Sequence, residues 1–243
     1  MPDPTAPPPL DSLPEVLPLF PLTGFLLLPG NWMPLNVFEP RYRHMVEDLL
    51  AESGDGGAYI GMIQPIVPAD DNHGPRDADP VDPMFVDPEA PVLYGVGCAG
   101  RLEKCEPQDD GRFHVLLRGV CRFRVAEEIG ERRGYRRARA DYRPFGADLG
   151  EPDAPVDPDP LLAALREFAG RQGLEIDFRR LELLPGPALV NGLSVALPFS
   201  PGEKQALLEA AGVEHRAELL LSLMGMGFPP GAGEGSAASP IVH

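Results

Sequence analysis

A serine and a lysine four positions apart are the first candidates for chemistry in this sequence. Ser200 and Lys204 stand in the stretch SPGEKQALLE, and on a helix their side chains would be neighbours, as a serine nucleophile and a lysine base must be. The same stretch is typical of a helix N-terminus, with Ser200 as N-cap, Pro201 at the first helical position and Glu203 completing a capping box. We therefore expect Ser200 to cap a helix, Lys204 to lie on the surface, and neither to be catalytic.

Metal and cofactor motifs are the next candidates. Cys98, Cys105 and Cys121 do not have zinc-ligand spacing, and two of them fall on apolar strand faces, where cysteine packs as a small hydrophobe. The acidic, proline-rich stretch 68–91 holds carboxylates, but not in the EF-hand register, and we interpret it as a long surface loop. Neither G-x-x-x-x-G-K-[ST] nor G-x-G-x-x-G after a strand occurs. The sequence predicts no metal site, no cofactor and no ATP hydrolysis.

Arginine is concentrated in one segment of a chain that is acidic overall. The formal net charge of -16 argues against a polyanion as the main partner, because phosphate binding needs a positive surface. Between positions 118 and 143, however, nine arginines stand against four acidic residues. This segment could dock an RNA backbone or an acidic peptide, or its arginines could pair with acids of the same chain, which we favour.

Short apolar stretches punctuated by proline predict the strands that must position these residues. Proline removes a ladder donor and belongs at strand ends, edges or turns, and short bent strands suit a small barrel. The expected strands are 17–22, 25–28, 33–38, 59–66, 92–105, 113–125 and 135–142. Asp110 and Gly111 predict a hairpin turn, after which alternation places Val115, Leu117, Cys121 and Phe123 inside and Arg112, His114, Arg118, Arg122 and Arg124 outside.

Helical periodicity appears once between the strands and then throughout the second half. Pro40 starts a helix with Tyr42, Met45, Val46, Leu49 and Leu50 on its buried face and Arg41, Arg43, His44, Glu47 and Asp48 towards water. Later helices are marked by apolar residues at Leu161, Leu162, Leu165 and Phe168, at Leu189, Val190, Leu193 and Leu197, and at Leu219, Leu220, Leu223 and Met224. Gly212 is the expected stop of the helix that Ser200 caps.

The expected organisation is one β-rich half followed by one helical half. We assign residues 1–14 to a disordered proline-rich arm, 15–145 to the β-rich half, 146–156 to a linker, 157–227 to the helical half and 228–243 to a disordered tail. The N-terminus lacks the pattern of a signal peptide, no apolar run reaches 18 residues, and the odd cysteine count suits a reducing compartment. A cytoplasmic location is expected.

Several motifs in order resemble the N-terminal substrate-binding domain of Lon-type ATP-dependent proteases. They are LPLFPL, LPG, PLNVFEPRYRHMV and LLRGVCRFRV, followed by the LPFSPGEKQALLE helix start, and together they span about positions 17–224. The resemblance implies an α+β fold, with a PUA-like β pseudo-barrel and one packed helix followed by a helical bundle. It also implies a domain that engages protein substrates, while the ATPase and peptidase domains of Lon are missing from this sequence.

Our hypothesis is therefore a stand-alone, non-catalytic module that binds other proteins or extended, unfolded peptides, as an adaptor in protein quality control or as a partner of a Lon-type protease. The groove between barrel and bundle is the expected docking surface, with Trp32 and Phe85 as aromatic anchors. RNA binding through the arginine-rich segment is the alternative, and a peptidase ranks last. The candidate binding residues are Trp32, Phe85, Arg118, Arg122, Arg124, Arg136, Arg137 and Arg139.

Overall fold

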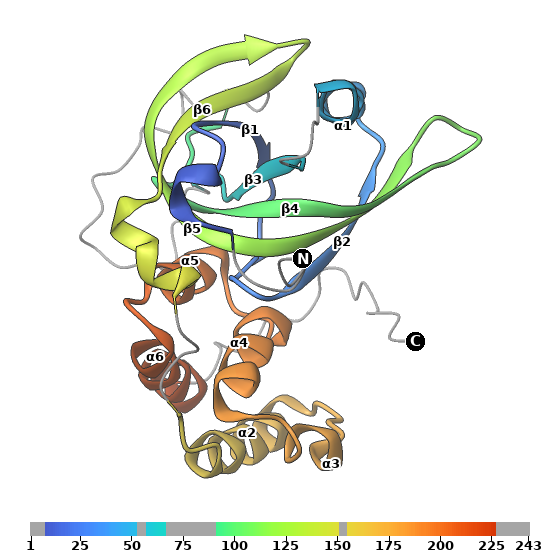
Figure 1. Cartoon of the computed structure of the whole chain (residues 1–243). Coiled ribbons are helices and arrows are strands. Elements are labelled where there is room, and N and C mark those ends of the chain that lie inside the picture. Colours follow the sequence, from blue (N-terminus) through green and yellow to red (C-terminus); the bar gives the residue numbers. More distant parts are fainter. Residues whose placement is uncertain (1–7, 53–56, 67–90, 151–154, 227–243) are drawn as a thin grey trace, which may run out of the picture.

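The computed structural model describes residues 8–52, 57–66, 91–150 and 155–226 (Figure 1). Its strands are β1 (Val16–Pro21), β2 (Trp32–Val37), β3 (Tyr59–Ile63), β4 (Val96–Pro107), β5 (Phe113–Arg132) and β6 (Tyr135–Asp141). They lie in the order β2-β5-β4-β3-β1-β6, and β5 also pairs with β6. The pairing of β5 with β6 closes strands β5, β4, β3, β1 and β6 into a barrel, and β2 lies outside this ring, paired with β5. The predicted β pseudo-barrel is confirmed.

The β4–β5 hairpin forms the long wall of the barrel. Its turn is closed by the Gln108 amide, which donates to the Arg112 carbonyl at 2.9 Å, and Gly111 has a φ of 79° that favours glycine. β5 continues to Arg132, beyond the predicted end at 125, and pairs first with β2 and β4 and then with β6. Register shifts in both of its long pairings allow the strand to bend, which a closed barrel requires.

The LPG motif forms a tight turn, and the strand predicted at 25–28 does not exist. The Asn31 amide donates to the Leu28 carbonyl at 3.0 Å around Pro29 and Gly30, and Gly30 has a φ of 81°. Proline followed by glycine at the two central positions is the pattern of a type II turn. The segment crosses β5 at Gly119, where an added Cβ would lie 2.1 Å from the Leu28 oxygen. Leu26, Leu27 and Leu28 are thus apolar because they cover the sheet, not because they belong to it.

Two hydrophobic cores lie on the two faces of the barrel wall. The inner core surrounds the Phe123 ring, and Gly61 and Gly97 make room for it, since a Cβ on either would come within 3.0 Å of the ring. The outer core begins at Phe20, whose ring stacks on Tyr42 of α1 (Pro40–Glu52) at 4.2 Å. Tyr42, Met45 and Val46 are buried as predicted, but Leu50 is 49% exposed because that turn of α1 extends past the barrel.

The outer core continues without a break into the helical half. The helices are α2 (Asp159–Gln172), α3 (Phe178–Leu181), α4 (Gly186–Ala196), α5 (Pro201–Glu209) and α6 (Val213–Met226), below the barrel in Figure 1. The capping box is confirmed, since Ser200 Oγ accepts from the Glu203 amide at 3.3 Å and Glu203 Oε2 accepts from the Ser200 amide at 2.7 Å. Gly212 does not end α5, which stops at Glu209. The Gly212 carbonyl instead accepts a hydrogen bond from the Arg216 amide in the first turn of α6.

Two short 3₁₀ helices lie where the sequence predicted an unstructured arm and a linker. Leu10–Ser12 form η1, and the neighbouring Leu13 is buried against the inner core, because the chain here closes one end of the barrel. Arg143–Leu149 form η3, which packs against β5 and so includes part of the predicted linker 146–156. The remainder of the arm, residues 1–7, the linker residues 151–154 and the tail from 227 lie outside the described residues.

Candidate functional site

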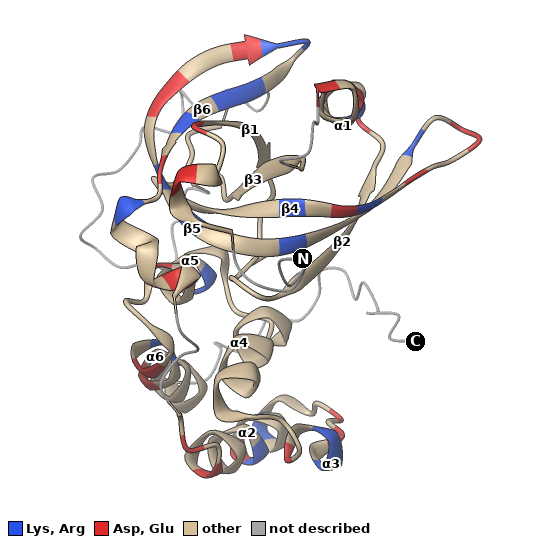
Figure 2. Ribbon diagram, viewed as in Figure 1, with Lys and Arg blue, Asp and Glu red and all other residues tan. Residues whose placement is uncertain are grey.

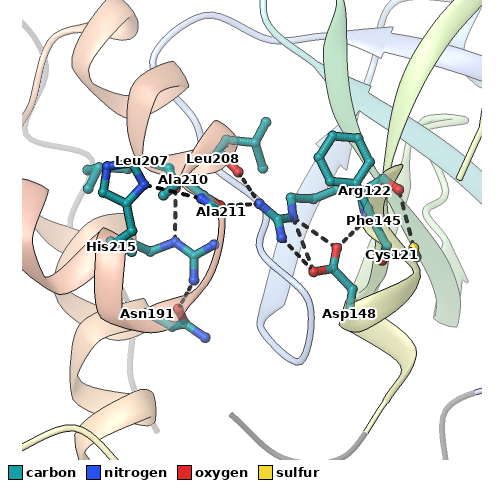
Figure 3. Close-up of polar contacts among 11 residues, drawn as sticks. Cys121, Arg122, Phe145, Asp148, Asn191, Leu207, Leu208, Ala210, Ala211 and His215 are labelled. Carbon is teal, nitrogen blue, oxygen red and sulfur yellow. Dashed lines mark hydrogen bonds and ion pairs between the residues drawn. The ribbon is translucent and has the colours of Figure 1, made fainter. Parts of the chain in front are cut away.

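Arg122 of β5 is buried between the barrel and the helical half, although alternation predicted that it faces water. Its Nη2 lies 2.7 Å from Asp148 Oδ1 of η3, and its Nη1 donates to the carbonyls of Leu208 at 2.9 Å and Ala210 at 2.5 Å (Figure 3). The guanidinium also lies 4.8 Å from the centre of the Phe145 ring. The outer face of β5 packs here against the end of α5 rather than against water, which explains why the alternation fails. Arg122 therefore joins the two halves of the chain.

We call the contacts of Arg122 with Asp148, Leu208 and Ala210 the clamp. In this clamp, charge and burial have opposite effects on the pKa of Arg122. Burial alone would lower the pKa of Arg122, but the hydrogen bonds and the charge of Asp148 outweigh it and raise the pKa. Arg122 also supplies a positive charge at the C-terminal end of α5, where the last carbonyls lack helical partners. Burial also raises the pKa of the neighbouring thiols, that of Cys121 to about 12 and that of Cys98 well above its ordinary value, which favours the protonated thiol at neutral pH.

A polar network fills the groove that the sequence suggested as a docking surface. Gln64 Nε2 donates to the Pro201 carbonyl at 3.1 Å, and Gln205 Nε2 donates to the Val96 carbonyl at 3.0 Å. Beside Gln64 lies a cavity of about 10 Å³, lined by residues that include Leu26, Met33 and Leu208, which is at most enough for one water molecule. Barrel and bundle are therefore joined by hydrogen bonds across this groove.

Ser200 and Lys204 do not form a nucleophile–base pair in the structure. Lys204 was predicted to lie on the surface, but it is only 8% exposed, because α5 lies against the barrel. Its Nζ donates to the carbonyls of Gly24 at 2.9 Å and Val195 at 3.2 Å. Burial lowers the pKa of Lys204. The Ser200 hydroxyl accepts the Glu203 amide, so the contacts of both side chains are those of structural residues.

Most arginines of the segment 118–143 are paired with acids of the same chain. Figure 2 shows the positive positions of the β5–β6 hairpin interleaved with negative ones, and others facing α1. The pairs join Arg132 to Asp48 and Glu52, Arg133 to Glu47 and Asp48, Arg136 to Glu128, Arg139 to Glu15 and Glu127, and Arg143 to Asp141. The interpretation that these arginines pair internally is confirmed for this group.

Asp48 is the centre of the contact between α1 and the β5–β6 hairpin, not a residue that faces water. Its side chain is 12% exposed and accepts from Arg133 Nη1 at 2.7 Å and from the Tyr135 hydroxyl at 2.9 Å. Burial would raise the pKa of Asp48, but the hydrogen bonds from Arg133 and Tyr135 and the charge of Arg132 outweigh it and lower the pKa. The arginines of this hairpin thus hold α1 in place.

Trp32 and Arg118 are the two candidate binding residues that the structure brings together on the outside. Trp32 is 54% exposed, and the Arg118 guanidinium lies 5.9 Å from its ring centre, within the range of a cation–π contact. Trp32 begins β2, which pairs with β5 and stands at one end of the sheet order. This pair therefore marks an exposed aromatic surface at a sheet edge.

The backbone of β2 points half of its polar groups away from the barrel. The Gly119 amide donates to the Asn31 carbonyl at 2.8 Å, and pairs in an antiparallel ladder alternate from there. Trp32, Pro34 and Asn36 consequently direct their backbone polar groups away from β5. The position of Pro34 fits this alternation, because proline has no N–H and so could not donate to Leu116 opposite it. Trp32 and Asn36 remain as donors along this edge.

The other candidate binding residues are scattered. Arg124 is exposed on β5, Arg136 and Arg139 are paired as above, and Arg137 is half-buried with an Nε that has no hydrogen-bond partner in the described part of the chain. Phe85 lies outside the described residues. Sequence reasoning missed Gln64 and Gln205, which make hydrogen bonds between the two halves, and Asp148, which pairs with Arg122. Nothing in their local sequence distinguishes them from surface residues, because their partners are distant along the chain.

Metal and membrane features can be stated for the described residues alone. Within residues 8–52, 57–66, 91–150 and 155–226, no cluster of three or more histidines, cysteines or acidic residues could hold a metal ion. All carboxylates of the stretch 68–91 lie outside these ranges. Among the described helices, none has the length and apolar character needed to cross a bilayer.

The fold and this surface define a class of protein in which a PUA-like β barrel is joined to a C-terminal helical bundle. The family model of the ATP-dependent protease La (LON) substrate-binding domain matches residues 16–225. This chain belongs to the LON substrate-binding domain family.

Relatives and solved structures agree with this assignment. The chain is 29% identical to Lon protease 2 of Sorangium cellulosum, with 92% of this chain and 26% of that protein covered, and 26% identical to Lon protease 2 of Myxococcus xanthus, with 92% and 25% covered. A crystal structure of a Lon N-terminal domain protein from Xanthomonas campestris matches with a TM-score of 0.55 and 27% identity over 86% of this chain and 98% of that one. The N-terminal domain of a Mycobacterium avium complex Lon protease shares the fold at 15% identity and a TM-score of 0.54.

The chain thus spans about a quarter of the length of the Lon proteases it matches. The match is to their substrate-binding domain, and the matched family model includes neither the ATPase nor the protease domain.

Proposed function

We propose that this chain is a non-catalytic module that binds extended segments of other proteins at the exposed edge of β2. The observation that carries the proposal is the half-exposed Trp32 on β2, the strand at one end of the described sheet, in a chain that belongs to a family of substrate-binding domains. An extended segment can add to such an edge through backbone hydrogen bonds, while an aromatic anchor contributes much of the affinity. An adaptor role in protein quality control, in the cytoplasm and beside a Lon-type protease, follows from this proposal.

The position of Trp32 supports its role as an anchor rather than as part of the core. Arg118 holds the ring from one side, and the backbone amides of Trp32 and Asn36 are directed along the same edge. An aromatic ring already held by a cation loses little side-chain freedom when a partner binds, which favours affinity. The partner we expect is an unfolded segment with apolar side chains at alternate positions, since these would lie on one face of the added strand.

The test is saturable binding of a fluorescein-labelled unfolded protein, reduced and carboxymethylated α-lactalbumin, measured by fluorescence anisotropy. Trp32→Ala is expected to weaken this binding by roughly tenfold or more, because truncating a central aromatic anchor costs at least about 1–2 kcal/mol. The matched control is Leu183→Ala, which removes an 84% exposed apolar side chain from the helical half. No saturable binding, or equal loss in both variants, would exclude the proposal.

RNA binding is the alternative that the same experiment must address. It rests on Arg136, Arg137 and Arg139, of which two are engaged by acids of this chain. A shift of labelled RNA at low salt that is lost when these three arginines are replaced would favour RNA over protein as the partner. Cleavage of casein that disappears in a Ser200→Ala variant would instead overturn the proposal that the module is non-catalytic.

A further inference from the structure

The exposed face of β2 carries an aromatic side chain at each end. Exposure alternates along the strand, with Trp32, Pro34 and Asn36 exposed and the residues between them buried or partly buried. Phe38 follows β2 directly, continues this alternation and is 61% exposed. Because alternate residues of an extended chain share a face, Trp32 and Phe38 lie on one face, about 20 Å apart along the chain.

No charged side chain protects this part of the sheet. Of the described strands, only β5 pairs with β2. Exposed edge strands normally carry charged side chains, which discourage other chains from pairing with them. The stretch WMPLNVF from Trp32 to Phe38 has none, and Pro34 removes only one of the outward donors. The edge therefore offers a partner two outward amides and two exposed rings.

An extended segment of another protein fits this edge better than a second copy of the chain. Stable interfaces use about 20–30 residues from each partner, far more than the stretch from Trp32 to Phe38 can supply. Two copies, each with a formal net charge of -16, would also repel one another. A single extended segment can bind at such a strand, because a few aromatic anchors and backbone hydrogen bonds supply its affinity. Since the edge has no charged side chain, the matching segment is uncharged between its anchors.

We propose that Phe38 is a second anchor beside Trp32, and that the bound segment pairs antiparallel with β2 over seven residues, with large apolar side chains at its first and seventh positions. This inference rests on the proposed function and adds to it the length, direction and register of the segment. Two anchors six positions apart select a segment by the spacing of its apolar residues as well as by their number.

The antiparallel direction fixes which backbone groups of the segment are used. Antiparallel ladders are slightly more stable per residue than parallel ones, and β2 already pairs in this way with β5. When the first residue of the segment lies opposite Phe38 and the seventh opposite Trp32, the third lies opposite Asn36 and pairs with its outward N–H and carbonyl. The fourth residue lies opposite Leu35 and directs its N–H away from β2.

The test uses neutral peptides titrated into ¹⁵N-labelled protein and followed by ¹H–¹⁵N correlation spectra. Each has a core of seven residues, two phenylalanines and five threonines, with Gly-Ser at both ends and blocked termini. The matched probe has phenylalanine at the first and seventh positions, and the control probe has it at the first and sixth, which places the two rings on opposite faces. We expect saturable shifts at the amides of Trp32 and Asn36, and at least about tenfold tighter binding of the matched probe, because the control probe uses one anchor at a time.

Two alanine variants separate the second anchor from exposed aromatic surface in general. Phe38→Ala is expected to weaken the matched probe by about tenfold and to leave the control probe nearly unchanged. The matched control is Phe25→Ala, which removes a 51% exposed ring that lines the small cavity with Leu208 instead of the exposed face of β2, and which should bind both probes like the parent. Both changes affect exposed side chains, so the melting temperature should stay close to that of the parent.

Proline in the matched probe tests the direction of pairing. At the third position proline removes the N–H that donates to the Asn36 carbonyl, so binding should weaken several-fold. At the fourth position it removes an N–H that faces away from β2, so the affinity should be nearly unchanged. In a parallel arrangement the fourth residue would bond to β2 and the third would not, so the reverse result would overturn the antiparallel direction.

The outcomes that overturn the inference are distinct from those that overturn the proposed function. Equal binding of the matched and control probes, or full binding of the matched probe by Phe38→Ala, excludes the second anchor, while Trp32-dependent binding of unfolded α-lactalbumin retains the proposed function. The absence of saturable shifts with the matched probe, when the unfolded protein does bind, excludes it as well. If neither the matched probe nor the unfolded protein binds, the proposed function falls, and this inference falls with it.

Discussion

Replacing Arg122 with methionine is expected to lower the free energy of unfolding by about 3–5 kcal/mol, the usual cost of removing one partner of a buried ion pair. The Arg122 and Asp148 side chains are 4% and 9% exposed, so water cannot take over the contacts of the remaining carboxylate. The carbonyls of Leu208 and Ala210 also lose a donor, and each unpaired group costs about 1–3 kcal/mol. The apolar surface of methionine offsets part of this sum.

This loss is large relative to the whole stability of a domain, which is about 5–15 kcal/mol. The measurement is equilibrium urea unfolding followed by far-ultraviolet circular dichroism, since Trp32 is half-exposed and a weak reporter of the core. Thermal melting should fall by about 6–20 °C, from about 2–4 °C for each kcal/mol in a chain of this size. Arg124→Met, two residues along β5 and exposed, is the matched control and should stay within about 0.5 kcal/mol of the parent.

A double-mutant cycle separates the ion pair from the packing around it. Combined with Asp148→Leu, the Arg122→Met change should cost at least about 1 kcal/mol less than the sum of the two single changes, because no buried charge is left alone. If Arg122→Met costs less than about 1 kcal/mol, or if the two changes are additive, the clamp does not hold the barrel to the helical half as we have argued.

Three further changes test other parts of the fold. Gly119→Ala should destabilise the protein by about 1–3 kcal/mol in urea unfolding, because its Cβ would lie 2.1 Å from the Leu28 oxygen, whereas Gly146→Ala meets no atom within 4 Å and should be nearly neutral; similar costs would contradict the close crossing. Asp48 has a lowered pKa in the folded state, so its contribution is present at neutral pH and lost as the pH falls below about 4; the stability difference between parent and Asp48→Asn should therefore shrink between pH 6 and pH 2, and a constant difference would argue against the ion pairs. Ser200→Ala should cost about 1 kcal/mol through loss of the N-cap, and an unchanged urea midpoint would show that the capping box contributes nothing.

Much of the fold could be predicted because strand and helix patterns are repeated over several residues. The alternation on β5 and the spacing on α1 identified most of the buried side chains, and the family motifs indicated how the halves are arranged. The strand at 25–28 was a wrong prediction, because a run of apolar residues is equally typical of a segment that lies across a sheet. The LPG turn that ends this segment was visible in the sequence, and its proline and glycine are the residues that a type II turn needs.

The candidate site was less predictable than the fold. Trp32 was predicted to be an aromatic anchor, and the structure adds that it stands beside Arg118 at one end of the sheet order. The groove between barrel and bundle stays a prediction as a docking surface, and the structure adds that Gln64, Lys204 and Gln205 make hydrogen bonds across it.

The sequence by itself determined the features whose partners lie within a few residues. The capping box of Ser200 and Glu203, the turn at Gly111 and the start of α1 at Pro40 depend on local backbone geometry, so residue types at fixed spacing are enough to specify them. Only the tertiary structure decided which charged residues are buried. Arg122 has the same place in the strand pattern as the exposed Arg124, yet it contacts a carbonyl 86 positions away at Leu208. Burial of a charge depends on which distant element covers it, and here Arg122 is buried because α5 packs against this part of the barrel.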